Sequence, residues 1–393
     1  MPAHGPVALG LSLPLWSVVP FVGLLLSIAL LPLFAPSLWA RHYAKVCLAF
    51  GVPVAGFFLL RAPRELLHTV LEYASFLILL ASLFTISGGI LLRGTLRGSA
   101  GVNCAILAVG AVLANVFGTT GASMLLIRPL LRANAHRHRK AHVVVFFIFV
   151  VANIGGALTP IGDPPLFLGY LRGVPFFWTL RAMGLLWAVA CALVIGVFYL
   201  VDRRALALDT VAGGDGGAVR AGAPDTVAAS GEARVPLSIE GKINLPLLMV
   251  VIGAVFLPTP WREMAMAAAA VVSAWKTPAK VREENEFTWY PIEEVAVLFA
   301  GIFATMIPAL LILKARGAEL GVVSPAHFFW ATGVLSSSLD NAPTYLTFFS
   351  LAQGVGGTQT VAGVSAPLLQ AIGAGAVFMG ANSYIGNAPN FMV

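Results

Sequence analysis

The sequence predicts an all-α polytopic membrane protein made of two inverted repeats, each with a re-entrant helical hairpin and a discontinuous helix. Three observations carry this prediction. Of the 393 residues, 59% are hydrophobic and 10% are charged, whereas soluble domains carry about 25% charged residues. Several apolar runs are long enough to cross roughly 30 Å of hydrocarbon. Finally, pairs of short apolar arms and Gly/Pro-rich breaks recur in the same order in both halves.

The first repeat, residues 1–204, is predicted to hold four full spans. They are expected at about 15–34, 43–60, 69–92 and 178–201. Between the third and the fourth lie two apolar arms, at about 101–117 and 121–131, separated by Gly118-Thr119-Thr120-Gly121. Each arm is too short to cross the bilayer. The pair is therefore predicted as a re-entrant hairpin over about 101–131.

The stretch NIGGALTPIGDPPLF, Asn153 to Phe167, interrupts an apolar helix predicted over about 143–171. Adjacent glycines weaken a helix, and proline removes a backbone donor and clashes with the preceding turn. Lipid cannot satisfy the freed N–H and C=O groups, so irregular backbone at membrane depth is buried in protein or lines a watery cavity. Asp163 at this break is therefore a candidate site residue.

Residues 205–240 are rich in Gly, Ala, Asp and Thr without apolar periodicity, which predicts a flexible cytoplasmic linker. The second repeat, 241–393, then follows the plan of the first. It is predicted to have spans near 243–257, 262–275 and 292–313, a hairpin at about 325–353 with its tip at Leu339-Asp340-Asn341-Ala342, and a broken helix from about 366. Because the first repeat continues for one more span, we expect the native chain to continue beyond Val393.

Two alignments support the repeat. LANVFGTTGASMLL at 113–126 lies over LSSSLDNAPTYLTF at 335–348, and IGDPPLFL at 161–168 lies over IGNAPNFM at 385–392, with nearly the same separation along the chain. With the N-terminus outside, the inner loops hold 17 of the 24 Lys and Arg residues, as the positive-inside rule requires. The two hairpins then enter from opposite sides, as in transporters built from inverted repeats. Without a targeting peptide, a bacterial inner membrane is favoured.

Asp163 and Asp340 are the carboxylates expected at membrane depth. Such groups are costly and usually mark an ion path, although each could instead cap a half-helix. Around them lie small residues whose oxygen atoms suit a hard cation such as Na⁺. These are Thr119, Thr120, Ser123, Asn153, Thr159, Ser337, Ser338, Asn341, Thr344, Asn382, Ser383 and Asn387. The alternative is that each Ser or Thr hydroxyl bonds only to its own backbone.

The blocks VFGTTGASMLLIRPLLRAN, NIGGALTPIGDPPLFLGYLRGVPFFWT, SSLDNAPTYLTF and ANSYIGNAPNFMV together resemble the NhaD-type Na⁺/H⁺ antiporters. These belong to the ion transporter superfamily, which also contains arsenite carriers and citrate or dicarboxylate carriers. The resemblance implies a scaffold and a transport domain that moves as an elevator, often in a homodimer. It places one site at Gly118, Thr119, Thr120, Asn153, Thr159 and Asp163. It places a second at Asp340, Asn341, Thr344, Asn382, Ser383 and Asn387.

The preferred function is a secondary active exchange of cytoplasmic Na⁺, or Li⁺, for external H⁺, in which Asp340 or Asp163 binds the two cations alternately. One alternative is a Na⁺-coupled carrier of a carboxylate or other oxyanion, with helix N-termini facing the anion; against it, the predicted site contains no Arg or Lys. A non-transporting membrane scaffold is a third. No GxxxxGK[ST] loop is present. The transported ions and the lipid bilayer are the expected partners, with no enzymatic activity, organic cofactor or nucleic acid.

Overall fold

The computed structural model describes residues 6–94, 96–212, 236 and 238–393. Within these ranges the chain is almost entirely helical, and seven helical segments are long and apolar enough to cross a membrane. They are Leu15–Phe34, Pro36–Arg61, Pro63–Ser87, Ala100–Ala133, Ala141–Leu158, Trp178–Asp209 and Tyr290–Leu320. The protein is therefore an integral, polytopic membrane protein.

The helices of the first half follow one another with short connections. They are α1 (Pro6–Ser12), the 3-10 helix η1 (Leu15–Val18), α2 (Val19–Phe34), α3 (Pro36–Arg61), α4 (Pro63–Ser87), α5 (Ala100–Ala133), α6 (Ala141–Val150), the 3-10 helix η2 (Ile154–Leu158), α7 (Pro164–Leu171) and α8 (Trp178–Ala212). A proline stands in the first turn of α3, α4 and α7, where its missing N–H has no helical partner to lose.

The second half has the same order of long, paired and interrupted helices. Its elements are α9 (Asn244–Ala254), α10 (Trp261–Lys276), α11 (Ala279–Glu284), α12 (Tyr290–Arg316), the 3-10 helix η4 (Gly317–Leu320), α13 (Pro325–Ser336), α14 (Asn341–Val355), α15 (Ala366–Met379), the 3-10 helix η5 (Gly380–Asn382) and α16 (Ala388–Met392). Two small antiparallel pairs join β1 (Leu91–Arg93) to β2 (Ser238–Glu240), and β3 (Thr360–Val361) to β4 (Val364–Ser365).

Two predictions for the middle of the chain differ from the structure. Helix α9 has 11 residues and α10 has 16, so at about 1.5 Å per residue they reach only roughly 17 Å and 24 Å. Both are shorter than the roughly 30 Å of a full span, although α10 covers the whole predicted range 262–275 and α9 ends three residues before the predicted end of 243–257. In addition, α8 continues to Ala212 and β2 begins at Ser238, so both ends of the predicted 205–240 linker are ordered. Residues 213–235 and 237 lie outside the described residues.

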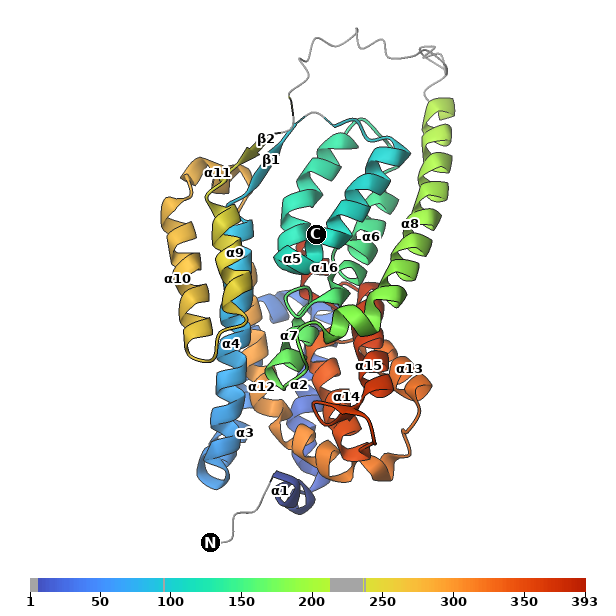
Figure 1. The fold of residues 1–393 in the computed structure, drawn as a ribbon. Helices are drawn as coiled ribbons and strands as arrows, with labels where there is room; N and C mark the ends of the chain where they lie inside the picture. Colours follow the sequence, from blue (N-terminus) through green and yellow to red (C-terminus); the bar gives the residue numbers. More distant parts are fainter. Residues whose placement is uncertain (1–5, 95, 213–235, 237) are drawn as a thin grey trace.

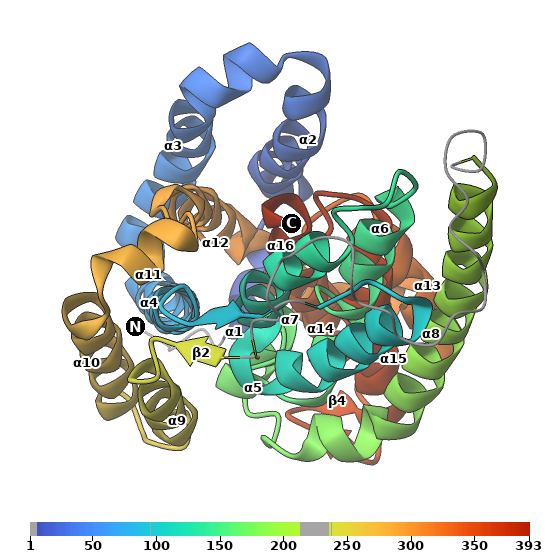
Figure 2. The same ribbon diagram turned by 90° about the horizontal axis from the view of Figure 1, so that it is seen from above.

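The molecule divides into two groups of helices when viewed from above (Figure 2). Helices α2, α3, α4 and α12 form one group, with α9 to α11 at its edge, and α5 to α8 and α13 to α15 form the other. Within the first group, the ring centroids of Phe76 and Phe299 lie 4.9 Å apart, and those of Phe76 and Phe303 lie 5.8 Å apart. This group packs against the side of the second that holds the chain breaks described next.

Candidate functional site

Helix α5 is a helical hairpin that folds back on itself at Gly118. A straight helix would separate Asn103 from Asn134 by roughly 45 Å at 1.5 Å per residue, yet their side-chain amides exchange hydrogen bonds of 2.9 and 2.8 Å. At the tip, Gly118 has φ 73° and ψ 158°, a backbone region that only glycine adopts without strain. The sequence GTTG thus forms a turn between the two predicted arms.

The base of this hairpin is fastened by a buried ion pair. Arg137 donates to the Asp202 carboxylate of α8 at 2.6 Å, and both side chains are almost fully buried, at 1% and 0% exposed. The same carboxylate lies 2.6 Å from His142 Nε2 and accepts a bond from Asn103 at 3.2 Å. A buried charge pair with additional hydrogen bonds holds its elements in one geometry. The two ends of the hairpin are therefore held against α8, which fixes the direction in which its tip extends.

The first chain break lies directly against the tip of α5. Between η2 and α7 the backbone turns so tightly that a Cβ on Gly162 would lie 2.1 Å from the carbonyl oxygen of Gly156, so glycine is needed there. The carbonyl of Gly162 accepts a hydrogen bond of 2.8 Å from the backbone N–H of Thr119. One bond thus joins the hairpin tip to the helix break.

The same contact recurs in the second half. Helices α13 and α14 form the second hairpin, in which the rings of Phe328 and Phe348 lie 6.2 Å apart. The N–H of Asn341 at its tip donates to the carbonyl of Gly386 at 3.1 Å. A Cβ on Gly386 would lie 2.2 Å from the carbonyl oxygen of Gly380. The aligned residues of the two halves therefore make the same tip-to-break contact.

Asp163 joins the two halves into one cluster. This carboxylate is 0% exposed and accepts three side-chain hydrogen bonds. Thr119 of the first hairpin donates at 3.2 Å, Asn341 of the second hairpin at 2.8 Å, and Asn387 of the second break at 2.8 Å. Asp163 precedes α7 without capping it through its side chain. Its oxygens are thus directed to the cluster and not to the helix end.

The cluster contains acceptor atoms that have no donor. Asn341 and Asn387 use their amide nitrogens on Asp163, and their Oδ1 atoms are buried without a hydrogen-bond partner among the described residues. An unpaired buried amide oxygen costs free energy. Two such oxygens beside a carboxylate form a set of hard oxygen ligands of the kind that binds a small cation. This arrangement is suited to Na⁺ or to an added proton as cargo.

Two further amides, those of Asn153 and Asn390, are linked to the cluster by hydrogen bonds. Asn153 donates to Asn390 Oδ1 at 2.6 Å, and its own Oδ1 accepts from Asn387 at 3.3 Å. Asn390 also donates to the carbonyls of Gly380 and Ser383 at 2.9 and 2.8 Å. These bonds connect the first break with the second and hold Asn387 toward Asp163.

Most of the remaining predicted site residues have partners other than Asp163. The Thr159 hydroxyl donates to the Asn115 carbonyl, and that of Thr344 to the Asp340 carbonyl. Asn382 bonds to the Ser337 hydroxyl, and the Ser383 hydroxyl accepts from Gly386 N–H. The Ser338 hydroxyl donates to the Val334 carbonyl, the Ser123 hydroxyl is buried without a partner, and Thr120 lines a small cavity with Asp340. In the described structure no hydrogen bond joins these side chains to Asp163.

Asp340 has a different environment from Asp163. Its Oδ1 accepts from the Ala342 N–H at 2.9 Å, so it caps α14 as the alternative for this residue proposed. It also lines a cavity of about 200 Å³ between the second hairpin and α12, which Glu294 and Tyr384 also line. The two aspartates thus have separate partners: Asp163 lies in the buried cluster, and Asp340 lies at the edge of a cavity.

Asn115 and Asn390 are parts of the site that were not predicted from sequence. Asn115 bonds through its side chain to the Gly155 carbonyl at 2.7 Å and the Leu158 N–H at 2.8 Å, so it holds the unwound segment η2 against α5. Its signal was an amide near the inner end of an apolar arm, three residues before Gly118. Asn390 follows Asn387 by three residues in NAPN, a spacing that returns to the same helix face.

Comparison with known proteins places the chain in a family. No curated protein was found to match it significantly. A family model described as "Putative citrate transport" matches residues 10–393, nearly the whole chain. This match supports the wider ion transporter grouping expected from the motifs and does not confirm the NhaD-type antiporters within it. The chain belongs to this citrate transport family, which indicates a secondary transporter of citrate-like or ionic substrates.

Proposed function

We propose that this protein is a secondary carrier of a citrate-like carboxylate, coupled to a cation that binds at the Asp163 cluster. The observation that carries the proposal is the convergence of both hairpin tips and both breaks on one buried carboxylate, with two amide oxygens lacking donors. The citrate transport family supports a carboxylate as the cargo. We take this cation to be Na⁺, and Li⁺ or H⁺ could bind in its place at the same oxygens.

The charge of Asp163 couples carboxylate transport to cation binding. A buried ionised Asp163 repels an approaching carboxylate, and a cation bound among Asp163, Asn341 and Asn387 removes this repulsion. The N-terminal ends of α14 and of the second arm of α5 then lie beside the neutralised cluster, and helix N-termini favour an anion. Cation loading therefore precedes carboxylate loading, and neither crosses efficiently alone.

The paired hairpins suggest how access alternates. In Figure 1 the arms of α5 extend toward one end of the molecule, whereas α13 and α14 lie toward the other. The two tip-to-break contacts, Thr119 to Gly162 and Asn341 to Gly386, have the same pattern. We infer that the halves are inverted repeats with re-entrant hairpins. On this reading α5 to α8 and α13 to α15 move as an elevator against α2, α3, α4 and α12, with a homodimer as the expected assembly.

The test is uptake of radiolabelled citrate into proteoliposomes under an imposed Na⁺ or H⁺ gradient. We expect gradient-driven uptake by the wild type. Asp163→Asn should lose this uptake, because a neutral amide cannot balance the positive charge of the cation. Glu283→Gln is the matched control, since Glu283 is exposed and far along the chain from the cluster. Uptake that is independent of both gradients, or that persists in Asp163→Asn, contradicts the coupling.

Na⁺/H⁺ exchange without a carboxylate remains a second candidate at the same cluster. It is favoured by one observation: within the described structure, no Lys or Arg side chain hydrogen-bonds to Asp163, Asn341 or Asn387. The same vesicles distinguish it. If Na⁺ induces proton flux without citrate, and Asp163→Asn abolishes that flux while citrate is never taken up, the protein is an exchanger.

A further inference from the structure

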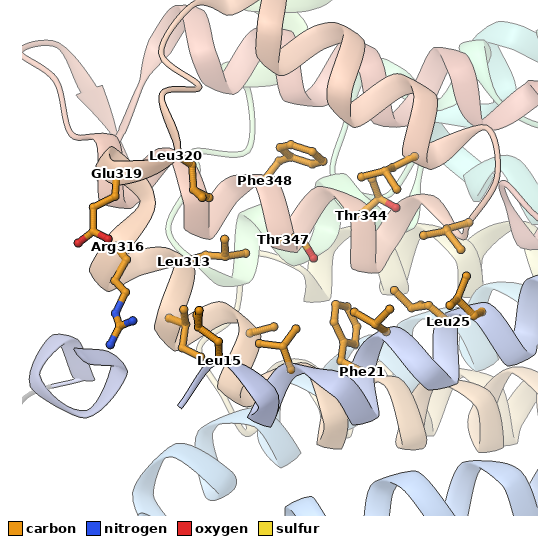
Figure 3. A pocket seen from close by; sticks show the side chains of 17 residues that line it. Leu15, Phe21, Leu25, Leu313, Arg316, Glu319, Leu320, Thr344, Thr347 and Phe348 are labelled. Carbon is orange, nitrogen blue, oxygen red and sulfur yellow. The ribbon is translucent and has the colours of Figure 1, made fainter. Parts of the chain in front are cut away.

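A cavity of about 600 Å³ lies between the first group of helices and the second hairpin (Figure 3). Side chains of η1 and α2, such as Phe21 and Leu25, point across it toward Thr347 and Phe348 of α14. Helix α12 supplies a third wall through Ala309, Ile312 and Leu313. The volume lies within the range of ligand pockets.

The lining offers almost nothing to a polar ligand. Two hydroxyls line the cavity, those of Thr344 and Thr347, and each donates to the carbonyl four residues earlier in α14, at 2.9 and 2.8 Å. Their hydroxyl hydrogens are therefore already used, and only their oxygen lone pairs remain for a ligand. Water placed here would have too few partners, because a buried water needs two to four polar contacts.

The cavity is continuous with the apolar outer surface. Leu15 and Val22 line it and are also 66% and 47% exposed, and Leu335 on the opposite wall is 41% exposed. Leu15 and Val22 belong to a segment that is long and apolar enough to cross the membrane. Hydrocarbon from the surrounding bilayer can therefore reach the interior of the cavity without crossing polar protein.

The charged residues lie together at one end. Arg316 and Glu319 lie at one end of the cavity in Figure 3, away from the apolar middle. The Arg316 guanidinium donates to the Leu11 carbonyl at 2.6 Å, and no other hydrogen bond of this group is found within the described residues. Its remaining donors suit a phosphate, which arginine binds through charge and paired N–H groups.

We propose that this cavity is a binding site for a membrane phospholipid, with one acyl chain between α2 and α14 and its phosphate near Arg316. The occupant would contact Leu339 and Thr344, which line the cavity and flank Asp340 in sequence. It therefore packs against the hairpin whose tip residue Asn341 bonds to Asp163. If this hairpin moves relative to α2, the bound acyl chain is displaced. The inference does not depend on which substrate the protein carries.

Native mass spectrometry of the full chain after detergent washing tests the site. We expect the wild type to retain a phospholipid. In Leu25→Trp the larger indole projects into the cavity where the acyl chain would lie. Retention should fall at least about tenfold, because losing the contacts of two methylene groups is enough for such a change. Leu30→Trp is the matched control, because Leu30 is on the same helix, 44% exposed and not part of the lining. Equal phospholipid retention by wild type and Leu25→Trp, or a mass that fits only free fatty acid or detergent, overturns the proposal.

A second measurement needs no variant. The wild type is placed in phosphatidylcholine vesicles whose acyl chains carry a photoactivatable diazirine. Thr344 and Phe348 are only 5% and 7% exposed, so a chain in the bulk bilayer barely reaches them, whereas a chain inside the cavity contacts both. Labelled peptides that include these residues support the site. Labelling confined to the exposed outer faces of the helices contradicts it.

Discussion

Asp163 and Asn387 occupy aligned positions in the two halves and meet in space, with Asn387 Nδ2 2.8 Å from Asp163 Oδ1. Their difference in chemistry is what makes the contact favourable, since an amide donates to a carboxylate and a second carboxylate would repel it. The sequence predicted two sites, one per half. In the structure, hydrogen bonds cross between the halves, so the residues of both form a single cluster around one charge.

Gly118 provides a test at the tip of α5. Its φ of 73° and ψ of 158° lie in a region essentially limited to glycine, so Gly118→Ala should cost about 1–3 kcal/mol. Gly184→Ala is the control: a Cβ there has no heavy atom within 4 Å, and alanine in a helix is favoured over glycine by up to about 1 kcal/mol. Thermal unfolding in detergent should show a lower midpoint for Gly118→Ala only. Equal midpoints would mean that the tip relaxes freely.

A substitution at Asn390 tests the hydrogen bonds that link Asn153 and Asn390 to the cluster. Asn390→Ala removes its bonds to Asn153, Gly380 and Ser383 and leaves buried groups unpaired, at about 1–3 kcal/mol for each. We expect a clear loss of thermal stability and weaker cation-driven uptake, because Asn153 no longer holds Asn387 in place. The exposed Asn382 gives the comparison, since Asn382→Ala removes one hydrogen bond, to Ser337, and should lower the midpoint much less.

At the scale of elements, one buried ion pair links the two groups of helices. Arg172, directly after α7, donates to both carboxylate oxygens of Glu72 in α4 at 3.0 Å, and Glu72 is only 6% exposed. Arg172 also lies 3.4 Å from the Ser350 hydroxyl of α14. The burial of Glu72 and Arg172 follows from the packing of α4 against α7, which the pattern of one segment does not contain.

Breaking this pair should destabilise the protein more than exchanging its two charges. Glu72→Gln leaves the largely buried guanidinium uncompensated, and the loss of one partner of a buried pair costs on the order of 3–5 kcal/mol. The double variant Glu72→Arg with Arg172→Glu restores opposite charges and should recover part of the loss. Thermal unfolding of the two variants is the measurement. A double variant no more stable than Glu72→Gln would show that the pair contributes through specific packing and not through charge.

At the scale of the whole molecule, the two hairpins extend from opposite ends toward a shared middle (Figure 1). The proposed topology, with the N-terminus outside and the 205–240 linker inside, places the α10–α11 connection in the cytoplasm and η4 outside. Lys280→Cys and Glu319→Cys introduce thiols at exposed positions of these two regions. A membrane-impermeant thiol reagent should label the Glu319 variant in intact cells and the Lys280 variant only in inverted vesicles.

The wild type is the background for this labelling. Its cysteines Cys47 and Cys191 are 3% and 7% exposed, and Cys104 is partly buried, so little labelling is expected without an added thiol. The reverse pattern, with the Lys280 variant labelled in intact cells, would invert the topology. It would leave the Asp163 cluster unchanged, because the hydrogen bonds of that cluster do not depend on which side faces the cytoplasm.

The sequence alone determined the membrane class, the positions of the long helices, and the breaks at Gly118, Asp163 and Asp340. These are local matters: apolar length decides whether a segment can span, and glycine and proline decide where it is interrupted. The prediction at 243–257 extended beyond the helix that forms, because the apolar run there continues past Ala254; the helix at 262–275 forms over its whole predicted range but is too short for a full span.

Only the tertiary structure decided which of the polar residues meet. Asn341 and Asn387 reach Asp163, whereas Thr159, Thr344 and Asn382 bond to Asn115, Asp340 and Ser337 instead. A side chain's partner depends on how distant segments pack, and the sequence pattern contains their spacing but not their approach. Asn115 and Asn390 entered the site for the same reason. The repeat therefore predicted the parts of the site, and packing of one half against the other joined them around one carboxylate.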